Sequence, residues 1–438
     1  MTPPTKQLAD DIFLRTLRSI DIPAVMAQKV AISPRRITLP EGTINIPDGA
    51  QFLVVAIGKA AHAMASGLIA LLPAGTPVRG IVAAPTPPAQ HLPGFQYFVG
   101  GHPIPNDESW QAADAILQLL RSSDARTVVF FLLSGGGSAL VERPLDPSMT
   151  LEDVRQLNRV LVTCGAPIDA MNTVRRHVSA VKGGRLAVAA GPSTKITLAV
   201  TDVPAGKESA LASGPSLPDP TSSADAERVF SDYQMKPRFP ASLQRWLQSG
   251  QMPETPKTGH EAFENAHFLL LLGMDDLFHA AHHALETYGY FCCCDNTTDD
   301  WPVEKAAEYL LAQLESLHRE NPRERVAIVA DGEVASPVTG DGTGGRNSAF
   351  VLSCVERIAG RDIVVLSAGT DGVDGNSPAA GAVADGNTLA QARAMGLDPR
   401  AAFRQSDAYT FFSRLGDAIV TGPTGNNLRD LRILMMSP

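Results

Sequence analysis

The sequence has little of several features that would assign a protein to a class at once. Its 438 residues include five cysteines, three of them adjacent at Cys292–Cys294, with no Cys-x-x-Cys pair and no disulfide framework. No apolar stretch approaches the roughly 20 residues that span a bilayer. The N-terminus carries Asp10 and Asp11 where a signal peptide would be basic and then apolar. We therefore expect a reduced, cytoplasmic protein that contacts no membrane.

The chain also has no excess of positive charge. Its formal net charge is −9, which leaves no electrostatic footprint for nucleic acid. Apolar residues make up 44% and charged residues 19%, as in ordinary globular enzymes. A chain of this length is too long for one core, so we expect two domains or three. A homo-oligomer is left open.

Short β-favouring runs alternate with stretches of helical periodicity along the chain. This alternation predicts an α/β fold with mainly parallel sheets. The runs are 52–57, 80–84, 128–133, 197–200, 268–272, 290–294, 326–330 and 363–366. A polar Pro/Gly stretch at about 247–264 reads as a linker. We therefore place an N-terminal domain at 1–250 and a C-terminal domain at 262–438, whose last helix or strand is free to pack back on the first.

The strongest local signal is the turn Ser134-Gly135-Gly136-Gly137-Ser138 after the buried run 128–133. A strand, a glycine turn and a helix start expose backbone N–H groups, which suit an anion. The sequence contains no Gly-x-x-x-x-Gly-Lys-Ser/Thr loop, so a bound phosphate needs a cation from elsewhere. The alternative is a tight strand-to-helix turn without a ligand.

Polar residues follow several of the predicted strands, where ligands of parallel sheets gather. Lys59 follows the run 52–57, Asp202 follows 197–200, Glu333 follows 326–330, and Asp371 follows 363–366. Each alone is equally compatible with a helix cap. Together with the triple-glycine turn, they predict a cleft between domains.

A second glycine-rich loop, 339–347, contains a literal Gly-x-Gly-x-x-Gly at Gly340–Gly345. Pro337 interrupts the run before it, and the next strand lacks the acidic residue of a dinucleotide site. The loop is either a mobile segment that delivers Arg346 to a carboxylate or phosphate, or a structural turn.

Six motifs occur in the order found in one known family. They are Leu132–Leu140, Met171–Ala187, Ala212–Thr221, Gly344–Asn347, Ala368–Gly375 and Thr421–Leu428. In these motifs the chain resembles the class II glycerate kinases, the glycerate 2-kinase family with a C-terminal domain named for a multi-organism fragment rich in leucine. The resemblance spans residues 8–438.

This resemblance implies a two-domain α/β protein with a Rossmann-like N-terminal domain and an active site in the interdomain cleft. It implies ATP-dependent, Mg²⁺-dependent phosphorylation of D-glycerate to 2-phosphoglycerate and ADP. Lys59 and Arg346 resemble the basic pair of the family, and the turn Ser134–Ser138 would hold nucleotide phosphates. Asp202 would orient or deprotonate the acceptor hydroxyl, or bind metal.

Further residues are candidates on the chemistry of their side chains. Glu333 and Asp371 could bind Mg²⁺, and Glu333 could instead line the cleft. Asn427 is either a polar contact or a plain turn residue. Arg175, with Arg176 and His177, belongs either to a solvated helix face or to the cleft.

The chain departs from the family pattern at three places. Ala330-Asp331-Gly332-Glu333 replaces a glycine-rich turn but keeps the glutamate, and Ser348-Ala349 follow Arg346-Asn347 where the family has Gln-Glu. The segment 294–301 differs most, which puts a role for an acidic residue near position 300 in doubt.

Several alternatives remain open. An NAD(P)-dependent hydroxypyruvate reductase and a non-catalytic nucleotide or sugar-acid binding protein are the other functions. His279 and His283 share a helix face without the glutamate of a zinc motif, and Cys292–Cys294 reads as a buried strand. His102 lies in either a rigid loop or an acid–base site.

Overall fold

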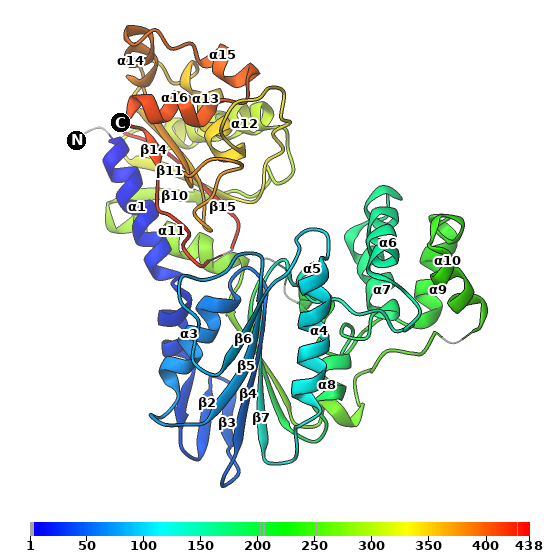
Figure 1. Cartoon of the computed structure of the whole chain (residues 1–438). Coiled ribbons are helices and arrows are strands. Elements are labelled where there is room, and N and C mark those ends of the chain that lie inside the picture. Colours follow the sequence, from blue (N-terminus) through cyan, green and yellow to red (C-terminus); the bar gives the residue numbers. More distant parts are fainter. Residues whose placement is uncertain (1–3, 202, 205, 251, 427) are drawn as a thin grey trace. The chain divides into compact units, whose positions relative to one another are not determined.

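The chain divides into two compact units in the computed structural model, which describes residues 4–438 except 202, 205, 251 and 427 (Figure 1). Residues 22–272 form the N-terminal unit. Residues 4–21 and 273–438 form the C-terminal unit. This division differs from the expected one at both ends. The strand at 266–272 still belongs to the first sheet, and the first helix belongs to the C-terminal unit.

The N-terminal unit contains a six-stranded parallel sheet in the order β6-β5-β4-β7-β8-β9. Numbered along the chain, this is the 3-2-1-4-5-6 order of doubly wound nucleotide-binding sheets. The central strand β7 is buried over its whole length, as its uninterrupted apolar sequence predicts. The strands are β4 (Gln51–Ile57), β5 (Val78–Ala84), β6 (Phe95–Val99), β7 (Thr127–Leu133), β8 (Thr194–Val200) and β9 (Ala266–Leu272).

Helices cover both faces of this sheet, with α3 on one side and α4 on the other (Figure 1). A separate group, α6, α7, α9 and α10, packs around its own hydrophobic cluster beside the sheet. The elements are α2 (Ile22–Lys29), β1 (Ala31–Ser33), β2 (Arg36–Leu39), β3 (Gly42–Asn45), α3 (Ala61–Leu71), α4 (Asp107–Leu120), α5 (Gly137–Leu140), α6 (Leu151–Thr163), α7 (Ile168–Val178), α8 (Arg185–Ala189), η1 (Glu208–Ser213), α9 (Ser223–Asp232), η2 (Lys236–Arg238), α10 (Ala241–Gln248) and η3 (Glu261–Phe263).

The C-terminal unit contains a mixed sheet in the order β10-β11-β15-β12-β13-β14. Its strands are β10 (Tyr290–Cys294), β11 (Arg325–Asp331), β12 (Ile363–Gly369), β13 (Gly381–Asp385), β14 (Ala418–Ile419) and β15 (Asp430–Met436). β10 and β11 run parallel, whereas the other neighbouring pairs run antiparallel. The expectation of mainly parallel sheets is therefore wrong for this unit. β12 and β13 are joined by a loop without the crossover helix that a parallel pair needs.

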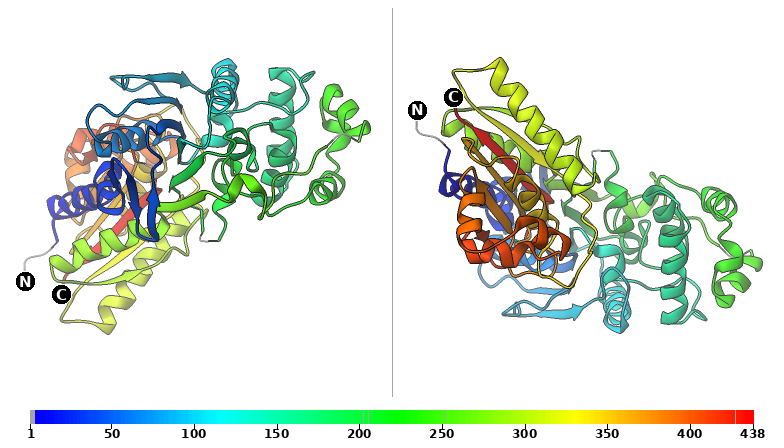
Figure 2. Two further views of the ribbon diagram at one scale, coloured as in Figure 1. Left: turned by 90° about the horizontal axis from the view of Figure 1, so that it is seen from below. Right: turned by 90° about the horizontal axis from the view of Figure 1, so that it is seen from above.

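Elements from the first and last parts of the sequence belong together in the C-terminal unit. The last strand, β15, lies in the middle of this sheet and belongs to the C-terminal unit. The first helix, α1 (Lys6–Ser19), buries Ala9, Ile12, Phe13 and Thr16 along one face and packs against α11 and β12. Lys6 at its start forms a 2.6 Å ion pair with Asp417. Figure 2 shows this blue helix beside segments from the opposite end of the sequence.

The main hydrophobic cluster of this unit lies between the sheet and a helical layer that includes α12 and α13. The helices are α11 (Met274–Thr287), α12 (Val303–Glu320), α13 (Arg346–Val355), α14 (Thr388–Ala394), α15 (Pro399–Arg404) and α16 (Ala408–Leu415). Within the described ranges, no helix is both long enough and apolar enough to cross a bilayer.

Candidate active site

Two turns meet where the strand order of the N-terminal sheet reverses. The chain leaves β4 through Gly58 and Lys59, and leaves the neighbouring β7 through Ser134 and Gly135. The Lys59 N–H donates to Gly135 O at 2.9 Å, and the Ala60 N–H donates to Ser134 Oγ at 3.0 Å. In doubly wound sheets this edge is where ligands bind. The structure thus places the backbone of Lys59 directly beside the triple-glycine turn.

Two glycines make this close approach possible. Gly58 has φ of +129°, and a methyl group there would lie 2.2 Å from Ser134 Oγ. Gly136 has φ of +84°, and a methyl group there would lie 3.1 Å from the His102 ring and 3.6 Å from Lys59 Cγ. Ser134 itself is fully buried and fixes the turn, while the next four residues face a pocket.

The pocket beside this turn, which we call the turn pocket, has a volume of about 560 Å³. Gly135–Ser138 form one wall, and Asn172, Arg175 and Lys207 lie on the others. No described residue accepts a hydrogen bond from the backbone N–H of Gly136 or Gly137. The helix after the turn, α5, spans only Gly137–Leu140, so these N–H groups matter more than a helix dipole. The arrangement suits an anion.

Arg175 and Lys207 give the turn pocket a positive character, with one carboxylate, Asp169, also in its wall. Burial lowers the pKa of His102, and the Lys59 ammonium lowers it further, so this imidazole is neutral near pH 7. Burial also lowers the pKa of Arg175, an effect that Glu142 partly offsets. His102 and the following Pro103 both line the pocket, so the structure leaves both readings of His102, loop and acid–base position, open.

A short relay connects Arg175 to the glycine turn. Arg175 Nη1 donates to Asn172 Oδ1 at 3.2 Å, and Ser213 Oγ donates to the same oxygen at 3.2 Å. The hydroxyls of Ser213 and Ser138 lie 2.6 Å apart. Ala212 and Ser213 both have positive φ, +50° and +60°, an uncommon conformation for residues with side chains. Such conformations persist where the surroundings hold them, which is typical of binding sites.

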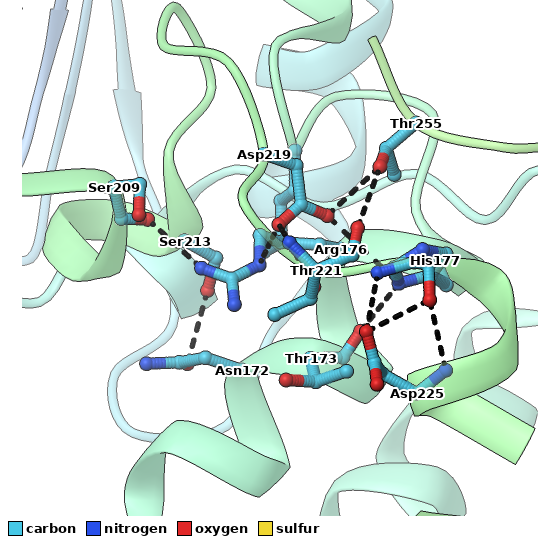
Figure 3. A network of polar contacts seen from close by, with 12 residues as sticks. Asn172, Thr173, Arg176, His177, Ser209, Ser213, Asp219, Thr221, Asp225 and Thr255 are labelled. Carbon is cyan, nitrogen blue, oxygen red and sulfur yellow. Dashed lines mark hydrogen bonds and ion pairs between the residues drawn. The ribbon is translucent and has the colours of Figure 1, made fainter. Parts of the chain in front are cut away.

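The next two residues of α7 turn away from the pocket into a buried polar network (Figure 3). Arg176 forms a 3.0 Å ion pair with Asp219 and donates to Ser209 O at 3.3 Å. His177 is fully buried, and its Nε2 lies 3.2 Å from a carboxylate oxygen of Glu254. The interpretation of this stretch as a solvated helix face is therefore wrong for Arg176 and His177. The expected linker also joins the network, through Glu254 and a 2.9 Å bond from Thr255 to Asp219.

Two of the sequence motifs come together behind the turn pocket. The N–H groups of Gly183 and Gly184 donate to the carbonyls of Ser213 and Gly214, at 3.0 and 2.7 Å. These bonds hold the strained 212–214 segment in place. The motifs Met171–Ala187 and Ala212–Thr221 thus form one support for the pocket.

The C-terminal unit holds Arg346 between two carboxylates. Its Nε donates to Asp430 at 2.5 Å and its Nη1 to Glu333 at 2.7 Å. Burial by itself would lower the pKa of Arg346, but Asp430 and Glu333 raise it above its ordinary value. A guanidinium has five N–H donors, so these two contacts orient the group and leave donors for a ligand.

A partly buried group of charges lies behind Arg346, at the ends of β11 and β15. Asp299 accepts from the Glu333 N–H at 2.8 Å and forms an ion pair with Arg429. Asp331 is fully buried, with Arg429 Nη1 3.6 Å from its Oδ1. Burial raises the pKa of Asp331 to about 6 despite Arg429 and Arg432. The divergent segment 294–301 therefore does contribute an acidic residue, Asp299, to this region.

The second glycine-rich loop is not a strand-to-helix turn. β11 ends at Asp331, and the Gly340–Gly345 stretch forms an irregular segment before α13. The start of α13 is capped by Asp374, which accepts from the N–H groups of Asn347 at 2.8 Å and Ser348 at 2.9 Å. A carboxylate already occupies the position where a dinucleotide fold holds pyrophosphate.

The remaining predicted site residues are either outside the described part of the chain or in the C-terminal unit. Asp202 and Asn427 lie outside the described residues. Asp371 lines a second pocket in the C-terminal unit, whereas Glu333 pairs with Arg346. Across the part of the chain that the structure describes, no three His, Cys, Asp or Glu side chains are placed to share a metal ion. This applies equally to His279 and His283. The expectation of a buried strand at Cys292–Cys294 is wrong, because Cys293 and Cys294 are exposed on β10, which lies at the edge of its sheet.

Comparisons with known proteins agree with this two-part organisation. Residues 8–248 match a domain of unknown function (DUF4147), and residues 326–430 match the MOFRL family. The D-glycerate 2-kinase of Thermotoga maritima is 32% identical over 426 residues, which cover 95% of this chain and 98% of that protein. The chain belongs to the glycerate kinase family.

Two further matches are a relative with a different name and a solved structure of a glycerate kinase. A protein of Agrobacterium vitis, described as a putative hydroxypyruvate reductase, is 35% identical over 402 residues, covering 90% of this chain and 89% of that protein. The crystal structure of a glycerate kinase from Thermotoga maritima has 30% sequence identity and a TM-score of 0.83, covering 98% of this chain and 99% of that chain.

Several residues near the candidate site of this glycerate kinase family member were missed by the sequence reasoning. Asp430 and Arg429 carry no local signal, because their partners come from distant segments. Asp374 stood within the motif Ala368–Gly375, but the sequence did not show that it caps a helix. Asp331 follows the predicted strand 326–330, as Glu333 does. No feature of the sequence singled it out, because its distinguishing property is its burial in the folded protein.

Proposed function

We propose that this protein is an ATP-dependent kinase that phosphorylates D-glycerate at the 2-hydroxyl, giving 2-phosphoglycerate and ADP, as a class II member of its family. The observation that carries the proposal is the glycine turn with Lys59 and Arg175 at the reversal of the strand order, in a chain whose relatives include glycerate kinases. Phosphoryl transfer depends mainly on positioning and charge neutralisation, which such groups supply.

Each group has a distinct role in the proposal. The N–H groups of Gly135–Ser138 bind phosphate oxygens without adding bulk, and Lys59 supplies the cation that the turn lacks. Arg346, fixed by Glu333 and Asp430, presents its remaining N–H donors to the transferring phosphoryl group. Asp202 orients the acceptor hydroxyl or accepts its proton.

Mg²⁺ belongs to the proposal as the ion that accompanies ATP. Mg²⁺ keeps several waters and needs only one or two protein carboxylates when phosphates supply other ligands. Asp371 and Glu333 are the protein candidates, and Glu333 also pairs with Arg346. Complete chelation of divalent ions is expected to abolish turnover, and dialysis into Mg²⁺ is expected to restore it. Turnover that survives chelation would contradict this part.

An NAD(P)-dependent hydroxypyruvate reductase is the second candidate, favoured by the name of the Agrobacterium relative. The context of the Gly340–Gly345 stretch argues against it. That stretch does not follow a strand directly, and Asp374 already caps the helix that follows.

One assay separates the two functions. Purified protein is mixed with D-glycerate, ATP and Mg²⁺ in a coupled assay of ADP release, and with hydroxypyruvate and NADH or NADPH in a parallel absorbance assay. We expect ADP release with D-glycerate and a product identified by NMR as 2-phosphoglycerate. Nicotinamide oxidation without ADP release would replace the kinase by the reductase.

A further inference from the structure

The C-terminal unit contains a larger pocket of different character from the turn pocket. It has a volume of about 970 Å³ and lies among the starts of α12 and α13, the segment after β11 and the loop after β12. Much of its wall is apolar, including Val303, Phe403 and two exposed valines, Val338 and Val373, with 84% and 46% of their surface accessible. We call it the apolar pocket. We propose that it binds the nucleoside part of ATP.

Charge argues against an anion as its ligand. Glu304, Asp371 and Asp374 line the apolar pocket, and the one guanidinium in its wall, Arg346, is already matched by Glu333 and Asp430. Apart from a group held by the remaining N–H donors of Arg346, a free carboxylate or phosphate in its interior would meet net negative charge. An uncharged nucleoside avoids that repulsion, and its ribose hydroxyls are donors that a carboxylate such as Glu304 accepts.

Backbone groups beside the apolar wall complete the chemistry of a base site. Ala335 is tied down, since its N–H donates to Trp301 O at 2.8 Å. Among the described residues, none accepts from the N–H groups of Ser336 and Val338, which flank Pro337 along the pocket. A flat heteroaromatic ring between apolar side chains, with its polar edge on such backbone groups, is a common mode of ligand recognition.

The turn pocket has the opposite character. Arg175 and Lys207 line it, with bare N–H groups at Gly136 and Gly137, and Asp169 there is paired with Lys207 at 2.7 Å. The smaller, positive pocket suits phosphates or the carboxylate of a three-carbon acid. This assignment of the two pockets rests on the proposed kinase function.

The test compares two exposed valines. Val338→Asp places a charge on the apolar wall, and Val162→Asp places the same charge on the exposed face of α6, where 64% of the valine surface is accessible. Binding of adenosine, which carries no phosphate, is measured by calorimetry, and KM is measured for ATP and for D-glycerate. We expect Val338→Asp to weaken adenosine binding and raise KM for ATP, each about tenfold, with KM for D-glycerate unchanged. Val162→Asp is expected to match the unchanged protein.

The outcomes separate this inference from the function on which it rests. If the unchanged protein phosphorylates D-glycerate but Val338→Asp leaves adenosine binding and KM for ATP unaltered, the pocket assignment is overturned and the kinase stands. A rise in KM for D-glycerate alone would assign the pocket to the acid instead. If the unchanged protein shows no ADP release with D-glycerate, the proposed function itself fails.

Discussion

Arg346 makes two contacts that a lysine cannot make together. Its Nε reaches the nearly buried Asp430 and its Nη1 reaches the half-exposed Glu333, in the fixed geometry of one planar group. Arg346→Lys keeps the charge but leaves one carboxylate without its partner and presents fewer donors to a ligand. We expect kcat to fall by roughly 10²-fold or more, with a small change in KM, in steady-state assays of ADP release.

A surface arginine provides the control for this substitution. Arg361 has the same side-chain exposure, 35%, and a single partner, Glu315, at 2.7 Å. Arg361→Lys is expected to leave kcat and the melting temperature essentially unchanged, because exposed ion pairs contribute little. An Arg346→Lys enzyme with the kcat of this control would remove Arg346 from the proposed chemistry.

Asp331 makes the stability of the C-terminal unit depend on pH. Burial raises its pKa to about 6 in the folded protein, above the ordinary carboxyl value of 3.8. Between these values the folded state holds a proton that the unfolded state has lost, so the free energy of unfolding falls as pH rises. The difference between these two pKa values corresponds to about 3 kcal/mol in the free energy of unfolding, which is present below pH 4 and lost above pH 6.

Asp331→Asn removes this titration while keeping the shape of the side chain. The stability of the variant relative to the unchanged protein is therefore expected to rise by about 3 kcal/mol between pH 4 and pH 7. Urea unfolding across this range measures the difference, in which other buried acids such as Asp10 cancel. A stability difference that does not change with pH would show that Asp331 is ionised in the folded protein throughout.

At the scale of elements, the turn after β4 depends on the absence of a side chain at Gly58. The Ser134 backbone carbonyl would lie 2.5 Å from a methyl group there, so Gly58→Ala displaces the neighbouring turn as well as straining φ. We expect a loss of about 3 kcal/mol or more in the free energy of unfolding and weaker binding of ATP, measured by urea unfolding and calorimetry.

Gly75→Ala separates strain from the clash in this experiment. Gly75 also has positive φ, +80°, but nothing lies within 4 Å of the added methyl group. Gly75→Ala is expected to lower the free energy of unfolding by about 1 kcal/mol and to leave ATP binding unchanged. Equal effects of the two substitutions would mean that the contact between the two turns is not important.

At the scale of the whole molecule, Lys59 and Arg346 belong to different units. If both act on one transferred phosphoryl group, removing the second residue after the first costs less than removing it from the intact enzyme. We therefore expect the double variant Lys59→Ala/Arg346→Lys to lose less in kcat/KM than the product of the two single losses. Losses that multiply fully would show that the residues act independently.

The sequence alone determined the parts of the protein that depend on local pattern. Uninterrupted apolar runs marked β4, β7 and β11 because a strand buried on both faces needs them. The glycine turn and Lys59 were found for the same reason, since both directly follow such strands. Pro337 also indicated, from the sequence alone, that the Gly340–Gly345 stretch does not follow the buried strand that a dinucleotide site needs.

The tertiary structure decided what depends on pairing between distant segments. That β15 lies between β11 and β12, and that α1 belongs to the C-terminal unit, follows from long-range packing that no local periodicity encodes. The same holds for the partners of Arg346, since Asp430 lies 84 residues further along the chain. Burial separates Asp331 from its neighbour Glu333, and burial is a property of the folded chain alone.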